Sequence, residues 1–439
     1  MRLHNLLVRS TWAERIRVSP YYPAVTHPVI RRLLPGIATS ALGDGMSAVA
    51  IAWLALKLAP PGSKGLWVGA AVAAYSLPGA AGAIVLRRWL RGRAGTRLAF
   101  ANAVVRALAL GLVAILALAG TLDPLAYAGL LGASSLLSAW GAAGKYTLIA
   151  DLLPAEQRVA GNTVFGLSDQ MSFMIGPALA GVVTALTGPA VVIAADAVSW
   201  AILAVSYARV TPLVNRLASP APEAAPEAAP EAGPKDQEKR GAWALIRSAP
   251  VLPGLLAMSF FFYLLYGPVE VALPVHVADD LHGSAALLGV FWAVFGVGAI
   301  FGELAAPFLR RLPVWPTMTV IVLGWGLALV PLGLSLPLGV VLGAFFAGAL
   351  IWGPWTSLSM AVFQDAAPPD ALAQVLTARG SLLIVASPLG TALGGPLVAA
   401  VGARGTLLVS ALGTIAIGIV AATLLALGRR RAPMVPAVR

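Results

Sequence analysis

Twelve long apolar stretches fill most of the chain between Leu33 and Leu427. Each is about long enough to cross a hydrocarbon layer ~30 Å thick as a helix. Because no water-soluble fold can bury so much apolar sequence, we predict an all-α membrane protein with twelve spans. The predicted spans are Leu33–Leu58, Leu66–Leu86, Leu98–Ala119, Leu125–Gly144, Val159–Leu186, Pro189–Val210, Val251–Val275, Ala285–Leu309, Thr317–Leu334, Leu338–Phe363, Leu372–Val401 and Thr406–Leu427.

Composition and missing motifs exclude several classes of protein. Charged residues make up 11% of the chain, whereas a soluble domain carries about 25%. The chain has no cysteine and therefore no disulfide or thiolate site. Gly144-Lys145 lacks the preceding glycine of an ATP-binding loop, and the four histidines lack the spacing of metal ligands. We therefore expect no enzyme activity, no cofactor and no metal.

Basic residues predict the topology. They gather before the first span, after the second, in the centre of the chain, after the eighth span and behind the last. All these segments fall on one side if the helices alternate, and cytoplasmic loops are the ones enriched in Lys and Arg. We therefore expect a cell-membrane protein with both termini in the cytoplasm. Topology also explains the net charge of +12, so we expect no nucleic-acid partner. The pairs after spans two and eight are Arg87, Arg88, Arg310 and Arg311.

A polar tract in the middle of the chain divides the spans into six and six. It repeats Pro, Glu and Ala from Ala221 to Ala228. Recurrent proline blocks helix formation, and the tract has little to bury, so we predict an extended, poorly ordered linker. The expected domains are a basic leader (1–32), a six-helix bundle (33–210), the linker (211–245), a second six-helix bundle (246–428) and a basic tail (429–439).

The two halves resemble each other in sequence. A shift of 214 residues, the difference between Pro154 and Pro368, also brings Gly176 onto Gly390 without gaps. Leu86-Arg87-Arg88 is likewise echoed by Leu309-Arg310-Arg311. Six spans return the chain to its starting side, so we predict a parallel repeat about an axis along the membrane normal.

These features resemble the major facilitator superfamily, and within it bacterial drug and siderophore exporters. The resemblance is carried by the segments Ala41-Leu42-Gly43-Asp44-Gly45, Leu152-Leu153-Pro154-Ala155-Glu156-Gln157-Arg158 and Gly176-Pro177-Ala178-Leu179-Ala180-Gly181. The last is similar to the Gly-Pro motif of proton-coupled antiporters, in which small residues let helices approach and proline bends the helix. Gly390 and Gly394 lie in the corresponding segment of the second half.

Two departures from the family pattern concern charge. The loop after the second span lacks the aspartate usual in the family, and the fourth span lacks the arginine that many drug antiporters carry. The family's proton-coupling scheme therefore does not carry over intact.

Ionisable side chains inside the spans are the candidate coupling residues, because each costs at least ~2.5 kcal/mol at the bilayer centre. Asp44 lies near the middle of the first span, which the resemblance places on the central cavity, so we predict a proton or substrate-cation site there. Glu270 in span seven, and Asp169 with Gln170 in span five, are further candidates. A structural hydrogen bond is the alternative role for each acid.

The remaining intramembrane charges are predicted to be structural. The family fold brings spans three and six together, so we expect Arg106 to pair with Asp196, with Asp169 as the alternative partner. Glu303 is expected to form a gating salt bridge with Arg310. Arg379 is expected to extend to the cytoplasmic surface.

Five aromatic residues are candidates to line an amphipathic pocket and to contact cations. Packing and anchoring at the membrane interface are the alternative roles. The Trp-Gly-Pro-Trp segment is the most specific, because its proline breaks span ten where the span would face the cavity. The five residues are Tyr263, Tyr266, Trp292, Trp352 and Trp355.

The resemblance and the buried acids together favour a secondary transporter that exports small amphipathic molecules in exchange for protons by alternating access. Its expected partners are a small-molecule substrate, protons and membrane lipids, and we expect a monomer. Alternatives with the same fold are a lipid or lysolipid flippase and an uptake carrier. A non-transporting membrane receptor or scaffold is the alternative from another class.

Overall fold

The computed structural model describes residues 21–90, 92–217, 251–309, 311–366 and 372–431. Most of the predicted leader, linker and tail lies outside the described residues. The same is true of Arg310 and of the side chains of Asp169 and Gln170.

The first half of the chain forms one helical bundle. Its helices are α2 (Tyr22–Thr26), α3 (Pro28–Leu58), α4 (Lys64–Val85), α5 (Arg87–Leu90), α6 (Gly95–Leu118), α7 (Pro124–Ser135), α8 (Ser138–Leu152), α9 (Ala155–Thr187) and α10 (Pro189–Leu217). Proline opens α3, α7 and α10, where its fixed φ suits the first helical turn and its missing N–H is not needed. Asp123 caps α7 by accepting from the backbone N–H groups of Leu125 and Ala126 at 2.9 and 3.0 Å.

The second half forms a matching bundle. Its elements are α12 (Val251–Val275), the π-helical turn η1 (His276–Asp280), α13 (Ala285–Leu309), α14 (Val314–Gly333), α15 (Leu338–Trp352), α16 (Trp355–Ala366) and α17 (Leu372–Arg431). Span ten is broken into α15 and α16 at Gly353-Pro354, and span four into α7 and α8. The long α17 turns back at Gly402, whose φ of +74° only glycine adopts readily.

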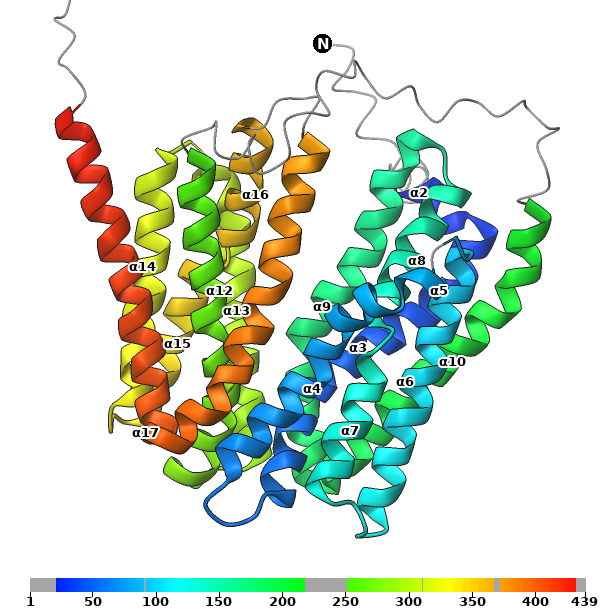
Figure 1. The fold of residues 1–439 in the computed structure, drawn as a ribbon, viewed down its shortest axis with the longest axis horizontal. Helices are drawn as coiled ribbons and strands as arrows, with labels where there is room; N and C mark the ends of the chain where they lie inside the picture. The colour runs from blue at the N-terminus through cyan, green and yellow to red at the C-terminus, as the bar shows by residue number, and fades with distance from the viewer. Residues whose placement is uncertain (1–20, 91, 218–250, 310, 367–371, 432–439) are drawn as a thin grey trace, which may run out of the picture.

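These helices confirm the predicted architecture of twelve spans in two six-helix bundles. Ten segments are long and apolar enough to cross a membrane, and α9 adds the apolar segment Ile175–Thr187. The last of the ten runs through the turn at Gly402 and supplies two crossings. The described ends of the chain, α2 and the end of α17, lie at the same end of the molecule (Figure 1), which we call the terminal face.

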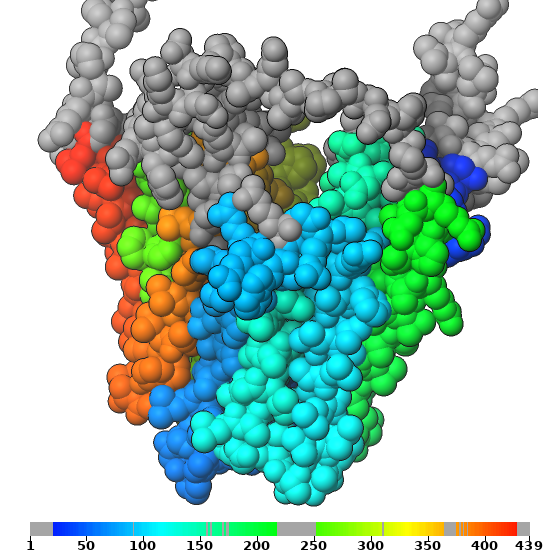
Figure 2. Space-filling model, turned by 45° about the vertical axis from the view of Figure 1, so that its right-hand side comes forward, coloured from blue at the N-terminus to red at the C-terminus, as the bar shows by residue number. Residues whose placement is uncertain are grey.

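The two bundles meet at the end away from the terminal face, here called the opposite face. A Cβ on Gly69 of α4 would lie 2.8 Å from the Cα of Gly395 of α17, and a Cβ on Gly181 of α9 would lie 2.7 Å from the Cα of Gly289 of α13. Figure 2 shows α4 in blue beside α17 in orange. The halves diverge toward the terminal face (Figure 1). The conformation is therefore closed at the opposite face.

An ion pair spans the same closed end. Lys64 Nζ of α4 lies 2.6 Å from Asp279 Oδ1 of η1. The two side chains belong to different halves, so the contact breaks when the halves separate there.

Candidate functional site

A charge cluster lies at mid-depth in the first bundle. Arg106 of α6 faces Asp44 of α3, with Nη2–Oδ1 and Nη1–Oδ2 distances of 3.3 and 3.4 Å. Tyr75 Oη donates to Asp44 Oδ1 at 2.6 Å and Trp200 Nε1 donates to the same oxygen at 3.3 Å. The guanidinium also lies over the rings of Tyr75 and Trp200, 4.9 and 4.5 Å from their centroids. Four helices thus hold one partly exposed carboxylate and one buried cation.

The cluster opens onto a polar pocket of about 300 Å³ within the first bundle. Asp44, Asn102 and Arg106 line it together with Lys145 of α8. Its remaining lining residues come from α3, α6, α8, α9 and α10, all elements of the same half. Asn102 Oδ1 and Arg106 Nε are buried without a hydrogen-bond partner, and such atoms are usually satisfied by water or ligand.

The described contacts of Asp44 lie within its own bundle, whereas from the sequence we expected it on the cavity between the halves. The side chain turns into its own bundle, because that is where the guanidinium and the two aromatic donors lie. The glycines that flank Asp44, Gly43 and Gly45, pack closely against neighbouring groups. A Cβ on Gly43 would collide with the Asp196 carboxylate, and one on Gly45 would collide with the backbone of Ser172.

The expected ion pair between Arg106 and Asp196 is also wrong. Arg106 pairs with Asp44, and Asp196 is fully buried beside them. Ser47 Oγ donates to Asp196 Oδ2 at 2.5 Å, and Ser199 Oγ lies 3.3 Å from Oδ1. Spans three and six do pack together, but Asp44 lies nearer to the guanidinium.

Close helix crossings occur at the glycines singled out in spans five and eleven. A Cβ on Gly176 would lie 2.6 Å from the backbone of Gly45, so α9 presses on α3 there. Gly390 of α17 lies against the backbone of Leu264 and Gly267 of α12, and Gly394 lies against Val271. Pro177 is buried beside Gly176. The two halves therefore repeat one crossing, α3 with α9 and α12 with α17.

Glu270 lies at the same α12–α17 crossing. It accepts a hydrogen bond from Thr391 Oγ1 at 3.1 Å. Tyr266, one helical turn earlier, stacks on Trp352 with ring centroids 6.3 Å apart, and Phe295 lies 5.3 Å from Trp352. A carboxylate beside a group of aromatic rings is a chemistry that suits organic cations.

The other aromatic candidates have separate positions. Trp355 is fully buried against Phe262, with centroids 4.6 Å apart, so its expected place on the pocket wall is wrong. Trp292 packs edge-on against Phe295 at 5.8 Å. Tyr263 lies 3.3 Å from Thr356 through their hydroxyl oxygens.

In the terminal half of the second bundle, the position of Arg379 also differs from expectation. Arg379 does not reach the surface: it is 7% exposed, donates to Ser359 Oγ at 3.2 Å and lies 5.3 Å from the ring centroid of Phe363. Glu303 accepts a hydrogen bond from Ser357, and its expected partner Arg310 lies outside the described residues. In the first half, Arg87 and Arg88 are exposed on α5.

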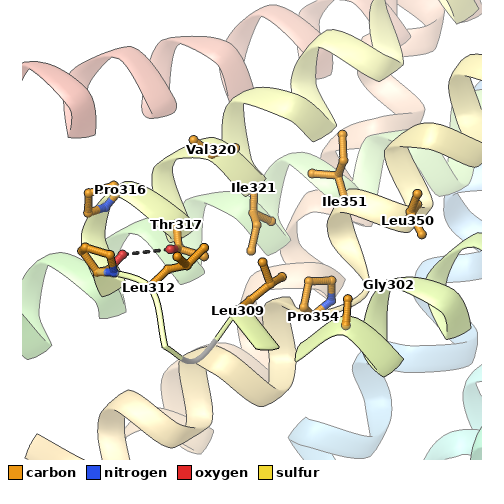
Figure 3. A pocket seen from close by; sticks show the side chains of 12 residues that line it. Gly302, Leu309, Leu312, Pro316, Thr317, Val320, Ile321, Leu350, Ile351 and Pro354 are labelled. Carbon is orange, nitrogen blue, oxygen red and sulfur yellow. Dashed lines mark hydrogen bonds between the residues drawn. The ribbon is translucent and has the colours of Figure 1, made fainter. Parts of the chain in front are cut away.

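A second hollow, of about 500 Å³, lies among α13, α14, α15 and the Pro354 turn (Figure 3). Its described lining is apolar except for Thr317, whose hydroxyl donates to the backbone oxygen of Pro313 at 2.8 Å. The described part of this lining offers no charged group to a proton or a substrate.

The comparisons with known proteins agree with this fold. The family model of the Major Facilitator Superfamily matches residues 33–383. The multidrug efflux pump Tap of Mycolicibacterium fortuitum is 26% identical over 87% of this chain and 92% of its own length. Tap of Mycobacterium tuberculosis is 29% identical over 67% of this chain and 70% of its own.

Two solved structures show the same fold. A D-xylose–proton symporter superposes with a TM-score of 0.66 at 12% identity, covering 90% of this chain and 96% of its own. A bacterial homologue of the iron transporter ferroportin, in an inward-facing state, superposes with a TM-score of 0.66 at 16% identity. The match covers 90% of this chain and 98% of the homologue. The fold, with its ionisable cluster inside the bilayer, defines a multi-pass membrane transporter and not an enzyme. The chain belongs to the Major Facilitator Superfamily.

Proposed function

We propose that this transporter exports small amphipathic molecules, cationic ones among them, in exchange for protons. The observation that carries the proposal is the Asp44–Arg106 pair at mid-depth, open to a polar pocket. Ionisable groups at this depth are costly and usually mark a transport pathway. Similarity to the Tap efflux pumps supports export as the direction.

Alternating access supplies the mechanism. The closed opposite face is held by glycine contacts and by Lys64–Asp279, so the two halves rock about the centre of the molecule. We propose that the terminal face is cytoplasmic, in keeping with the basic loops. Substrate then enters between the halves from the cytoplasm, and proton uptake from the other side resets the empty transporter.

The substrate is proposed to bind against the second half, near Glu270. Tyr266 lies one helical turn before that carboxylate, and it stacks on Trp352, which Phe295 contacts in turn. An organic cation would meet a negative charge and a π surface together. The proton would occupy the charge cluster of the first half, so substrate and proton have separate sites.

Reconstituted vesicles test the proposal. With an imposed pH gradient, the purified protein should move ethidium, rhodamine or tetracycline against a concentration gradient. Asp44→Asn should abolish the stimulation by the gradient, because the carboxylate that holds Arg106 loses its charge. Asp123→Asn is the matched control, since Asn preserves the α7 cap in a loop far from the cluster. If the flux of all three probes were the same with and without the pH gradient, proton coupling would be contradicted.

A further inference from the structure

The charge cluster holds two carboxylates and one guanidinium. Asp44 and Asp196 both lie close enough to Arg106 to interact with it electrostatically. In the conformation described, only Asp44 is in ion-pair contact with it. Among the described residues no cation lies within ion-pair distance of Asp196. One negative charge is therefore left over if both acids are ionised.

Donor groups are distributed unequally between the two acids. Asp44 is held by the guanidinium, by the Tyr75 hydroxyl and by the Trp200 indole N–H. Asp196 has Ser47 at 2.5 Å and a longer contact to Ser199, whose hydroxyl lies nearer to the Asp196 backbone oxygen, at 2.7 Å. An ionised carboxylate offers about four acceptor sites. A buried carboxylate with a single close hydroxyl leaves most of these sites and its charge unsatisfied, whereas a protonated acid carries no charge to compensate.

The groups that face Asp196 from the packed helices are few. Asp44 comes from α3 and Arg106 from α6, with Tyr75 of α4 behind them. From α9, Ser172 is the described polar side chain that reaches the adjoining pocket. None of these supplies a second positive charge, although Lys145 of α8 lines the adjoining pocket with Asp44 and Arg106.

We propose that Asp196, and not Asp44, carries the proton that couples transport in this half of the molecule. This inference rests on the proposed function and names the residue within its proton site. Asp44 is then a positioning residue that holds Arg106 away from Asp196 while the proton is bound.

The exchange of partners gives the coupling step. Arg106 lies between the faces of Tyr75 and Trp200, which favour a cation at any point along them. When the guanidinium moves from Asp44 toward Asp196, the O–H bond of Asp196 breaks and its proton passes to water in the adjoining pocket. Asp196 becomes the paired carboxylate, so one proton leaves per exchange. Asn102 lies one helical turn before Arg106 on α6 and lines the pocket together with Lys145, which gives the proton a route away from the cluster.

Infrared spectroscopy on the protein in lipid at neutral pH tests where the proton resides. The C=O band of a protonated carboxylic acid should be present in the wild type, absent in Asp196→Asn and shifted in Asp196→Glu. Asp44→Glu should leave the band in place. Glu270→Gln separates any contribution from the second half. A band that shifts with Asp44→Glu, or no change with either Asp196 variant, would overturn the assignment.

Thermal stability gives a second test that does not depend on glutamate fitting at the crowded site. Asparagine is nearly isosteric with protonated aspartate and keeps the Ser47 partner, so Asp196→Asn should be at least as stable as the wild type. Asp44→Asn should be less stable, because Arg106 loses its partner. The reverse order would refute the inference. Neither test measures transport. A wild type without gradient-driven flux would therefore contradict the proposed function but not the assignment of the proton to Asp196.

Discussion

Arg106 is the residue on which the cluster depends. It is 7% exposed and forms the ion pair with Asp44. Removing one member of a buried ion pair costs roughly 3 kcal/mol, and the partial exposure of Asp44 reduces this penalty. We therefore expect Arg106→Gln to lower the thermal unfolding temperature strongly, as followed by the fluorescence of the native tryptophans.

Tyr75→Phe is the matched comparison for Arg106→Gln. It removes one hydrogen bond to Asp44 and keeps the ring under the guanidinium, so a loss of about 1 kcal/mol is expected. Equal shifts for the two variants would show that the ion pair contributes nothing beyond an ordinary hydrogen bond.

Glu270 tests the substrate side of the account. In Glu270→Gln the side-chain oxygen still accepts from Thr391, but the negative charge is gone. Ethidium should bind about tenfold more weakly, which corresponds to ~1.4 kcal/mol. Binding of the neutral probe chloramphenicol should be unchanged, as measured by quenching of tryptophan fluorescence. A parallel loss for both probes would point to a change of packing and not of charge.

Residue-scale prediction from sequence was limited by helix rotation. Neighbouring residues on a helix point about 100° apart, and a span that is apolar all round does not reveal which face is inward. Asp44 was therefore expected in the central cavity and Arg106 was expected to pair with Asp196. Tyr75 and Trp200 were not identified, because nothing in the sequence distinguishes them from the other aromatic residues in the spans.

At the scale of elements, glycine spacing sets the two crossings. Gly176→Val places branched carbon atoms into the backbone of Gly45, whereas a Cβ added to Gly166 on the same helix meets no atom within 4 Å. Overpacking of this kind costs about 1–3 kcal/mol. We expect Gly176→Val to lower stability and flux and Gly166→Val to be tolerated.

The second half offers an independent repetition of this test. Gly390 meets the backbone of Leu264 and Gly267, and Gly380 meets nothing. Gly390→Val should therefore lower stability and flux, and Gly380→Val should be tolerated. If all four variants behaved alike, close approach of the helices would not be what these glycines provide.

Elements were the most predictable part of the molecule. The apolar stretches gave the spans, because the bilayer leaves a long apolar segment no other structure to adopt. The constant shift between Pro154 and Pro368 indicated the paired crossings. Loop prolines and small residues keep the same spacing in both halves only when the helices correspond. The broken spans at Leu136-Leu137 and Gly353-Pro354 had a sequence signal only in the second case.

For the whole molecule, the closed opposite face depends on helix contact more than on charge. Lys64 and Asp279 are about two-fifths exposed, and an exposed pair contributes ~0.2–1 kcal/mol. Gly69 meets Gly395 backbone to backbone. We expect Gly69→Val to favour a conformation open at that face and Lys64→Ala to change little.

The absence of native cysteine makes this prediction measurable. Spin labels at Thr121→Cys and Leu336→Cys, in exposed loops of opposite halves, should report a longer distance in Gly69→Val than in the parent. Gly129→Val, where no atom lies near the added group, is the control. Unchanged distances in Gly69→Val would remove the glycine contact as the closing element.

The central claim is that substrate is exchanged for protons. Its most direct test uses a substrate gradient to drive proton movement. Vesicles loaded with ethidium on one side, without an imposed pH gradient, should acquire a pH difference as ethidium runs down its gradient and protons move the opposite way. Asp196→Asn should let ethidium exchange while proton movement ceases. Ethidium movement with no proton movement in the wild type would contradict the account.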